Sequence, residues 1–458
     1  MAVKYALHSI AIVRVSLCVL LLAASGMAGM KAGVATRTIT PGTLPFWLSG
    51  YAARSSPATS VAQDIFAKAL AIEDESGHRV VVVTLDLIGV PRTLRDEVAR
   101  EVEKAHGLDP TALLLNCSHT HSGPAVQDNL EIMFDFDDAD RARVLEYREF
   151  LRTNIGAVVG EALQKLEPAA IGYGTGSADF AADRRALRVK QADPSANPAT
   201  YIDHTVPVLK VTSADGRVLA ILFGYACHNT TLTGEFLEIS GDYAGHAQAD
   251  LEDAYPGATA MFMLLCGADQ NPNPRSSKAF AVAHGRALAD SVQSTLAQTL
   301  SPVDGEIRTS LVSRTLPLKP RTREEIEAEQ EDPDRFRQRR ASWVLGRIAR
   351  GEDVSAVEYP VQALRIGDDF VIVGLGGEVV VEYGLRIKES LPGKRVIVAG
   401  YSNDVMCYIP NRRILNEGGY EADDSMIYFG QAAPFMDSVE ERVMAGVTDA
   451  LAAVGISK

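Results

Sequence analysis

Two histidines that stand two residues apart are the sharpest chemical signal in this chain of 458 residues. His119 and His121 directly follow a strand-like run at 112–117. If that strand continues through them, side chains two apart point to the same side, so both imidazoles face one pocket. One ring can then bind a metal ion while the other reaches a substrate. The sequence SGP at 122–124 is typical of a sharp turn, as expected where a strand end shapes a site.

A third histidine also follows a strand-like run. His228 comes after residues 221–226, and open α/β sheets bind ligands at that end of their strands. A single histidine of this kind is more often a buried core residue with its hydrogen bonds satisfied than a metal ligand. Asp242, in the sequence SGDY at 240–243, has two interpretations. It orients a histidine through the second ring nitrogen, or it is an ordinary helix N-cap.

Two further polar loops end apolar runs. Residues 266–272 (CGADQNP) follow the buried strand expected at 258–265, and Glu378 follows the apolar run at 370–375. Each loop alone is often only a turn, but several polar loops after successive strands indicate a common site. The chain has no HExxH helix, no GxSxG elbow and no GxxxxGK[ST] loop, so the best-known zinc-protease, serine-hydrolase and phosphate-binding motifs are excluded.

Strand-like and helix-like segments alternate along most of the chain. We expect strands at 80–87, 112–117, 206–212, 217–225, 258–265 and 359–374, and helices at 93–106, 140–166 and 380–391. The Glu- and Arg-rich segment 320–353 predicts an exposed helical excursion, with Thr322 and Glu325 spaced as a capping box. The pattern predicts an α/β fold, in which a layered mixed β-sheet core with flanking helices carries the active site at strand C-terminal ends.

The charge balance and the first residues bear on where the protein works and on what it binds. A net charge of −14 argues against binding nucleic acid or an anionic membrane surface, and favours a small or neutral substrate. Residues 1–28 have the basic start, short apolar run and small-residue end of a signal peptide, and no later segment is typical of a membrane span. We therefore expect a secreted or periplasmic protein in which residues 29–458 form a single catalytic domain.

Four cysteines follow the expected signal peptide: Cys117, Cys227, Cys266 and Cys407. Their spacing matches neither a zinc ribbon nor a redox CxxC pair. Each lies within a few residues of one of the motifs above, which indicates that they gather around one site. Two of them could be bridged in an oxidising compartment, or all could be small buried residues beneath a pocket.

Taken together, these motifs resemble the neutral, non-lysosomal ceramidase family. The resemblance depends on the order of SHTHSGP at 118–124, CH at 227–228, SGD at 240–242, GADQNP at 267–272, GE at 377–378 and NDVMCY at 403–408. It runs from residues 33–41 to 420–421. The family binds one zinc ion through two histidines, a glutamate and a tyrosine. The resemblance therefore implies one Zn²⁺ per chain, held by His119, His228, Glu378 and Tyr408.

The resemblance also implies roles around the metal. His121 would hydrogen-bond the substrate or the attacking water, and Tyr420 would stabilise the oxyanion. Arg184 would line the pocket, with Arg185 as its neighbouring alternative. Two histidines and a carboxylate are by themselves a common hydrolytic zinc set.

The chain departs from the family at the catalytic serine, where it carries Asn271. Asparagine cannot act as that nucleophile, but its amide can donate a hydrogen bond to an oxyanion. Zinc-activated water would then attack. The chain also stops soon after the catalytic region, where similar ceramidases continue into a sandwich domain. We expect an amidohydrolase, with an N-acyl lipid as one candidate substrate. The alternatives are a metal-containing binding protein without turnover and a zinc hydrolase of a small soluble amide or ester.

Overall fold

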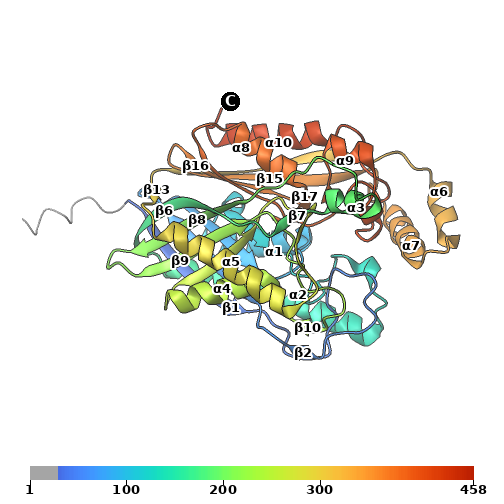
Figure 1. Cartoon of the computed structure of the whole chain (residues 1–458), viewed down its shortest axis with the longest axis horizontal. Helices are drawn as coiled ribbons and strands as arrows, with labels where there is room; N and C mark the ends of the chain where they lie inside the picture. Colours follow the sequence, from blue (N-terminus) through green and yellow to red (C-terminus); the bar gives the residue numbers. More distant parts are fainter. Residues whose placement is uncertain (1–28, 458) are drawn as a thin grey trace, which may run out of the picture.

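Two β-sheets pack face to face, and helices cover the outer face of each sheet (Figure 1). The computed structural model describes residues 29–457. The layers are therefore helix, sheet, sheet and helix, which confirms the predicted α/β class with a layered mixed-sheet core. The predicted signal peptide at 1–28 lies outside the described residues. Within residues 29–457, no helix has the length and apolar character needed to cross a membrane.

The larger sheet has nine strands in the order β11-β9-β8-β6-β1-β3-β4-β5, with β13 paired to β6. It is mixed, because β4–β5 and β9–β11 are parallel pairs and the other pairs are antiparallel. Its strands are β1 (Lys31–Thr38), β3 (Phe66–Glu73), β4 (Arg79–Leu85), β5 (Leu113–Cys117), β6 (Glu167–Ser177), β8 (Thr205–Ser213), β9 (Val218–Tyr225), β11 (Thr259–Leu264) and β13 (Ser301–Pro302).

The smaller sheet has four strands, β14 (Ile307–Pro317), β15 (Ala356–Ile366), β16 (Phe370–Leu375) and β18 (Arg395–Ala399), in that order. Three short pairs complete the strands of the described chain. They join β2 (Ser60–Val61) to β10 (Glu238–Ile239), β7 (Ala181–Asp183) to β12 (Gln270–Pro272), and β17 (Glu378–Val379) to β19 (Tyr408–Ile409). The last two pairs contain residues that the sequence assigns to the site.

Strand alternation explains the layers. On β4, Val80 and Val82 point into the core between the two sheets, whereas Val81 and Val83 point toward α1 (Arg92–His106) and α2 (Asp138–Gln164). The same alternation on β8, β9 and β11 buries one face under α4 (Asp242–Ala254) and α5 (Lys278–Leu296). The smaller sheet packs its outer face against α8 (Val381–Glu389) and α10 (Val439–Ala453) (Figure 1).

The remaining helical segments are short or lie outside these layers. They are α3 (Arg184–Ala192), α6 (Arg323–Ala328), α7 (Arg335–Ala349), α9 (Arg412–Glu417), η1 (Pro110–Ala112), η2 (Glu131–Met133), η3 (Glu329–Glu331) and η4 (Asp424–Ile427). The charged segment 320–353 contains α6, η3 and α7, and the capping box of Thr322 and Glu325 is present. One expected strand was wrong in its extent. Residues 359–374 span two antiparallel strands, β15 and β16, because the chain reverses near Gly367, whose φ is 63°.

Candidate metal centre

His119 lies just beyond the end of β5, in a backbone conformation that histidine seldom adopts. The strand stops at Cys117, and His119 has a φ of 58°, in the left-handed region. Its Nδ1 donates to the carbonyl of Ile88 at 2.6 Å. The expectation that strand alternation aims His119 and His121 was therefore wrong, because the strand does not continue. The rings still converge, and their Nε2 atoms are 3.1 Å apart.

His228 follows β9 and is fixed by backbone contacts. Its N–H donates to the carbonyl of Gln270 at 3.1 Å, and its Nδ1 donates to the carbonyl of Gly267 at 3.0 Å. A carbonyl can only accept, so Nδ1 carries the proton and Nε2 presents a lone pair. Burial lowers the pKa of His228 to about 4, which keeps the ring neutral at physiological pH.

Asp242 does not orient a histidine. Its carboxylate accepts the N–H groups of Leu232 at 2.8 Å and Tyr243 at 2.6 Å, at the start of α4. The carbonyls of Ile88 and Gly267 take the orienting role instead. That interpretation was wrong because loop backbone already lies beside both rings. The N-cap interpretation was also wrong, because Gly241 is the N-cap of α4 and Asp242 is the first residue of the helix.

Glu378 and Tyr408 are brought together by the β17–β19 pair, in which they stand directly opposite each other. The Oε2 atom of Glu378 lies 3.1 Å from Nε2 of His119 and 3.1 Å from Nε2 of His228. The hydroxyl of Tyr408 lies 3.2 Å from Nε2 of His228. The four residues named as ligands from the sequence thus meet at one buried point, although they are spread over almost 300 positions of the chain.

The donor chemistry at this point fits a divalent cation. Oε2 of Glu378 is buried and accepts no hydrogen bond from the described residues, although two imidazole Nε2 atoms lie 3.1 Å away. His119 and His228 both donate their Nδ1 protons to backbone carbonyls. While the rings are neutral, neither Nε2 atom carries a proton that it could donate to Glu378. Neutral imidazoles and a carboxylate are typical zinc donors.

His121 joins the same cluster. One side-chain nitrogen from each of His119, His121 and His228 lies within 4.8 Å of the others, so three histidines could also hold a metal ion. Burial, followed by His119 and His228, lowers the pKa of His121 well below its usual value. Its Nδ1 has no hydrogen-bond partner among the described residues. The geometry is therefore compatible with His121 as a ligand or as a group that faces a substrate.

Several residues at the centre were missed by the sequence reasoning. Tyr401 is buried, with its ring 4.5 Å from that of His119 and its hydroxyl 3.5 Å from Nδ1 of His228. The ring of Tyr51 is 4.7 Å from that of His121, and Arg54 donates to the carbonyl of His121 at 3.1 Å. Residues 51 and 54 belong to an irregular loop without periodicity. For Tyr401, the available signal was its place in the same short segment as Tyr408.

Arg184, rather than Arg185, lies beside the proposed ligands. Its guanidinium carbon is 5.4 Å from the ring of Tyr408 and 5.5 Å from the ring of Tyr420, and its Nε donates to the buried carboxylate of Glu421 at 2.6 Å. Arg185 reaches away to Glu417 at 2.9 Å as well as to Glu421. The ring of Tyr420 is 5.4 Å from that of Tyr408. Tyr420 is half-buried beside this proposed ligand.

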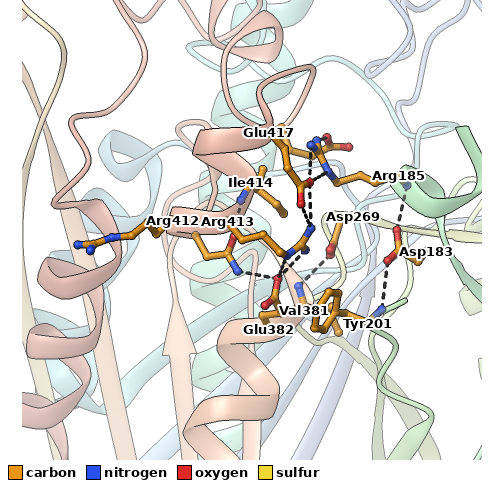
Figure 2. A network of polar contacts seen from close by, with 12 residues as sticks. Asp183, Arg185, Tyr201, Asp269, Val381, Glu382, Arg412, Arg413, Ile414 and Glu417 are labelled. Carbon is orange, nitrogen blue, oxygen red and sulfur yellow. Dashed lines mark hydrogen bonds and ion pairs between the residues drawn. The ribbon is translucent and has the colours of Figure 1, made fainter. Parts of the chain in front are cut away.

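A polar network beneath the centre holds the segments that carry these residues (Figure 2). Asp183 accepts the N–H groups that open α3 and also the N–H of Tyr201. Glu382 on α8 accepts two hydrogen bonds from Arg413 on α9, at 2.9 and 2.5 Å. Glu417 then joins Arg413 to Arg185. The network ties together the helices next to Arg184, Glu378 and Tyr408.

The loop that contains Asn271, at the position of the family's serine, lies against the segments that carry His228 and Arg184 and against the start of α8. Asn271 is half-buried on β12, opposite Ala182 of β7. The residue before it supplies the carbonyl that accepts the N–H of His228. Asp269 accepts the N–H of Val381 at 2.9 Å, at the start of α8, and its carbonyl accepts the N–H of Arg184 at 3.0 Å. Burial raises the pKa of Asp269 to about 6.

The four cysteines within residues 29–457 are free and buried beside these motifs. Cys117, Cys227, Cys266 and Cys407 each lie next to, or within two residues of, a proposed ligand or the Asp269 loop. Burial raises the pKa of each thiol. The interpretation as small buried residues is therefore the one that the structure supports, and no bridge joins them.

A family model described as "Neutral/alkaline non-lysosomal ceramidase, N-terminal" matches residues 30–289, more than half of the chain. The chain belongs to this family. Among curated relatives, the neutral ceramidase of Pseudomonas aeruginosa is 25% identical over 253 residues, covering 53% of this chain and 37% of the relative. The neutral ceramidase of Drosophila pseudoobscura pseudoobscura is 23% identical over 271 residues, covering 55% and 38%. The matched part is thus well under half of each relative's length.

Solved ceramidase structures share the fold. The crystal structure of neutral ceramidase from Pseudomonas aeruginosa superposes with a TM-score of 0.71 at 20% identity, covering 94% of this chain and 75% of that one. A ceramidase described as complexed with C2 gives a TM-score of 0.71 at 19% identity, covering 94% and 77%. The family model includes the three histidines, but Glu378, Tyr408 and Tyr420 lie beyond its end. For those three residues, it is the geometry of this chain that joins them to the histidines.

Proposed function

We propose that the protein is an exported, zinc-dependent amidohydrolase that cleaves the amide of an N-acyl lipid. The observation that carries this proposal is the buried convergence of two imidazole Nε2 atoms on a carboxylate oxygen that has no proton donor. Membership of the ceramidase family supports the choice of an amide. The relatives named neutral ceramidase support the choice of a lipid amide.

His119, His228, Glu378 and Tyr408 would hold the zinc ion. When bound, zinc polarises a carbonyl and lowers the pKa of water to about 7. The carbonyls of Ile88 and Gly267 keep two of the imidazoles in the tautomer that a ligand needs. The protein thus presents the metal with a site whose ring orientations are set in advance.

Three further residues would act on the substrate. Hydrolysis adds the oxygen of water to the amide carbon and breaks the C–N bond, and a proton from the water ends on the leaving nitrogen. The free Nδ1 side of His121, or its Nε2, can accept that proton and pass it on. Burial raises the pKa of Tyr420, which keeps its hydroxyl protonated and able to donate to the oxyanion. The amide of Asn271 would offer a second donor.

The substrate contact that we assign to Arg184 follows from its position. The side chain is buried between Tyr408 and Tyr420, and its Nη2 has no partner among the described residues. A buried guanidinium N–H without an acceptor is costly. A polar group of the substrate that accepted this N–H would remove that cost, which is why we place the lipid head group there.

Metal content and a matched set of variants test the proposal. Protein purified without chelator should contain one zinc ion per chain by mass spectrometry, and His119→Ala and His228→Ala should lose the metal and activity while remaining folded. His78→Ala, which removes a largely exposed histidine in the β3–β4 turn, is the control and should keep both. A chain that neither contains nor binds a stoichiometric metal would end the proposal.

A substrate panel tests the lipid amide and the alternatives. Zinc-loaded protein should release fatty acid from N-acyl lipids faster than it cleaves short soluble amides or esters. The asparagine at the family's serine position favours one other candidate, a metal-containing binding protein without turnover. Such a protein would be stabilised by the lipid and would form no product. Export is tested by sequencing the N-terminus of the protein recovered outside the cytoplasm, where cleavage near Ala28 is expected.

A further inference from the structure

A buried side chain joins the two edges of the large sheet. Strands β5 and β11 are at opposite ends of the strand order. Asn116 on β5 nevertheless accepts the N–H of Leu264 on β11 at 2.8 Å and donates to the carbonyl of the same residue at 3.1 Å. The amide of Asn116 therefore replaces one rung of backbone pairing and closes the curled sheet at this point.

The closure explains why the ligands meet. His119 lies two residues beyond the end of β5, while His228 follows β9, the neighbour of β11. Without a link between the sheet's two edges, these loops would lie at opposite ends of it. Asn116 also donates to the carbonyl of Gly400 at 2.8 Å, which leads into the segment that ends at Tyr408.

A second pair of amides joins the smaller sheet to the same strand. Asn403 donates its N–H to the carbonyl of Leu115 and accepts the N–H of that residue through Oδ1, at 2.8 and 3.1 Å. Its Nδ2 donates to Oε1 of Gln362 on β15 at 2.7 Å. Gln362 in turn donates to the carbonyls of Thr111 and Leu113 at 2.7 and 3.2 Å. All three amides are buried, and each has its donors and acceptors paired.

We propose that Asn116, Gln362 and Asn403 are positioning residues that set the separation of the metal ligands. They touch neither the substrate nor the metal, and they act through the backbone of β5, β11 and the segment 400–408. Fully satisfied buried polar networks specify one arrangement of the segments they join, which apolar contacts alone would not do. This inference rests on the proposed function, because it assumes that the four ligands hold a metal ion.

Metal affinity and the cobalt spectrum test the inference directly. Asn403→Gly keeps a residue that tolerates the observed φ of 65° and removes only the side-chain links. Asn116→Leu and Gln362→Leu remove the other two amides at similar volume. In each folded variant we expect the dissociation constant for zinc to rise at least tenfold, measured by competition with a chromophoric chelator. We also expect the visible d–d bands of the Co²⁺-substituted protein to shift or weaken.

A control variant separates positioning from lost stability. Leu151→Ala removes a fully buried side chain of α2, which packs on β1 and β3, and should lower the thermal midpoint without changing zinc affinity or the cobalt bands. Wild-type affinity and bands in Asn403→Gly would overturn the inference while leaving the proposed function intact. If the wild-type protein binds no metal, both fail. If Asn116→Leu does not fold, Asn403→Gly and Gln362→Leu decide the matter.

Discussion

Replacing the buried Glu421 with glutamine should destabilise the protein strongly at neutral pH. The Glu421 side chain is fully buried, and its carboxylate accepts Arg184 Nε at 2.6 Å and Arg185 Nη1 at 2.6 Å. Glutamine keeps the size of the side chain but removes the charge. The guanidinium of Arg184, which is only 7% exposed, would then be buried without a counter-ion. Breaking one partner of a buried pair costs about 3–5 kcal/mol.

The pKa of Glu421 gives an independent magnitude. Burial acts to raise this pKa, but Arg184 outweighs it and lowers the value from 4.5 to about 2. At 1.36 kcal/mol for each pH unit, that difference corresponds to about 3 kcal/mol. The folded pKa is depressed, so this stabilisation is fully present above pH 4.5 and is lost as the pH falls toward 2. Both arguments give the same order of magnitude.

Urea unfolding of Glu421→Gln and wild type between pH 7 and pH 3 tests the reasoning. We expect the variant to be less stable by about 3 kcal/mol at pH 7, and the difference to shrink below pH 4.5 as the wild-type carboxylate takes up a proton. Glu327→Gln is the matched control. It breaks an exposed pair with Arg323 on α6, which should cost less than about 1 kcal/mol. If Glu421→Gln is no less stable than Glu327→Gln at pH 7, or if the difference is independent of pH, the assignment of a buried ion pair is wrong.

Three other substitutions test local features. Gly50→Ala should displace His121, because a Cβ at this position would lie 2.2 Å from Nδ1 of the ring, and kcat/KM on the best amide should fall at least tenfold. Gly77→Ala is the control for backbone strain. Gly77 also has positive φ, but a Cβ there would have no atom within 4 Å, so kcat/KM should stay the same. Asn271→Ala should lower kcat by about 10²-fold if its amide donates to the oxyanion, whereas an unchanged kcat would remove Asn271 from the mechanism. Thr322→Ala should cost about 1 kcal/mol in urea unfolding through the lost cap of α6 and leave kcat unchanged; a change in kcat would mean that α6 takes part in the site.

The layers and most elements could be predicted from the sequence, because hydrophobic periodicity is a local property. The runs that became β4, β5, β9 and β11 are apolar and have strand length, and the polar stretch that became α1 has helical spacing. The extents were less secure. The turn signal within 359–374 is Gly367, Asp368 and Asp369, and these three residues form the reversal between β15 and β16.

The candidate site was found largely because three of its four proposed ligands end apolar, strand-like runs. His119, His228 and Glu378 were visible as polar residues that end apolar runs, and Tyr408 entered through the family resemblance. What the sequence could not supply was the geometry of the loops. The two-residue spacing of His119 and His121 suggested strand alternation. In the structure the strand ends before them, and the left-handed backbone conformation of His119 brings the two rings together. Tyr401 and Tyr51 were missed because they contact the histidines only in the folded chain, and no sequence spacing predicts such contacts.

The backbone around the centre carries strain that the rest of the fold must offset. His119, Tyr401 and Asn403 all have positive φ, at 58°, 51° and 65°, although none is glycine. Such conformations cost about 1–3 kcal/mol each and persist only where the surroundings hold them. Here the holding contacts are backbone hydrogen bonds from His119 to Leu87, just beyond the end of β4, and from Asn403 to Leu115 on β5. Because the same contacts fix the positions of the ligand donors, loosening the sheet edges should release the strain and the metal together.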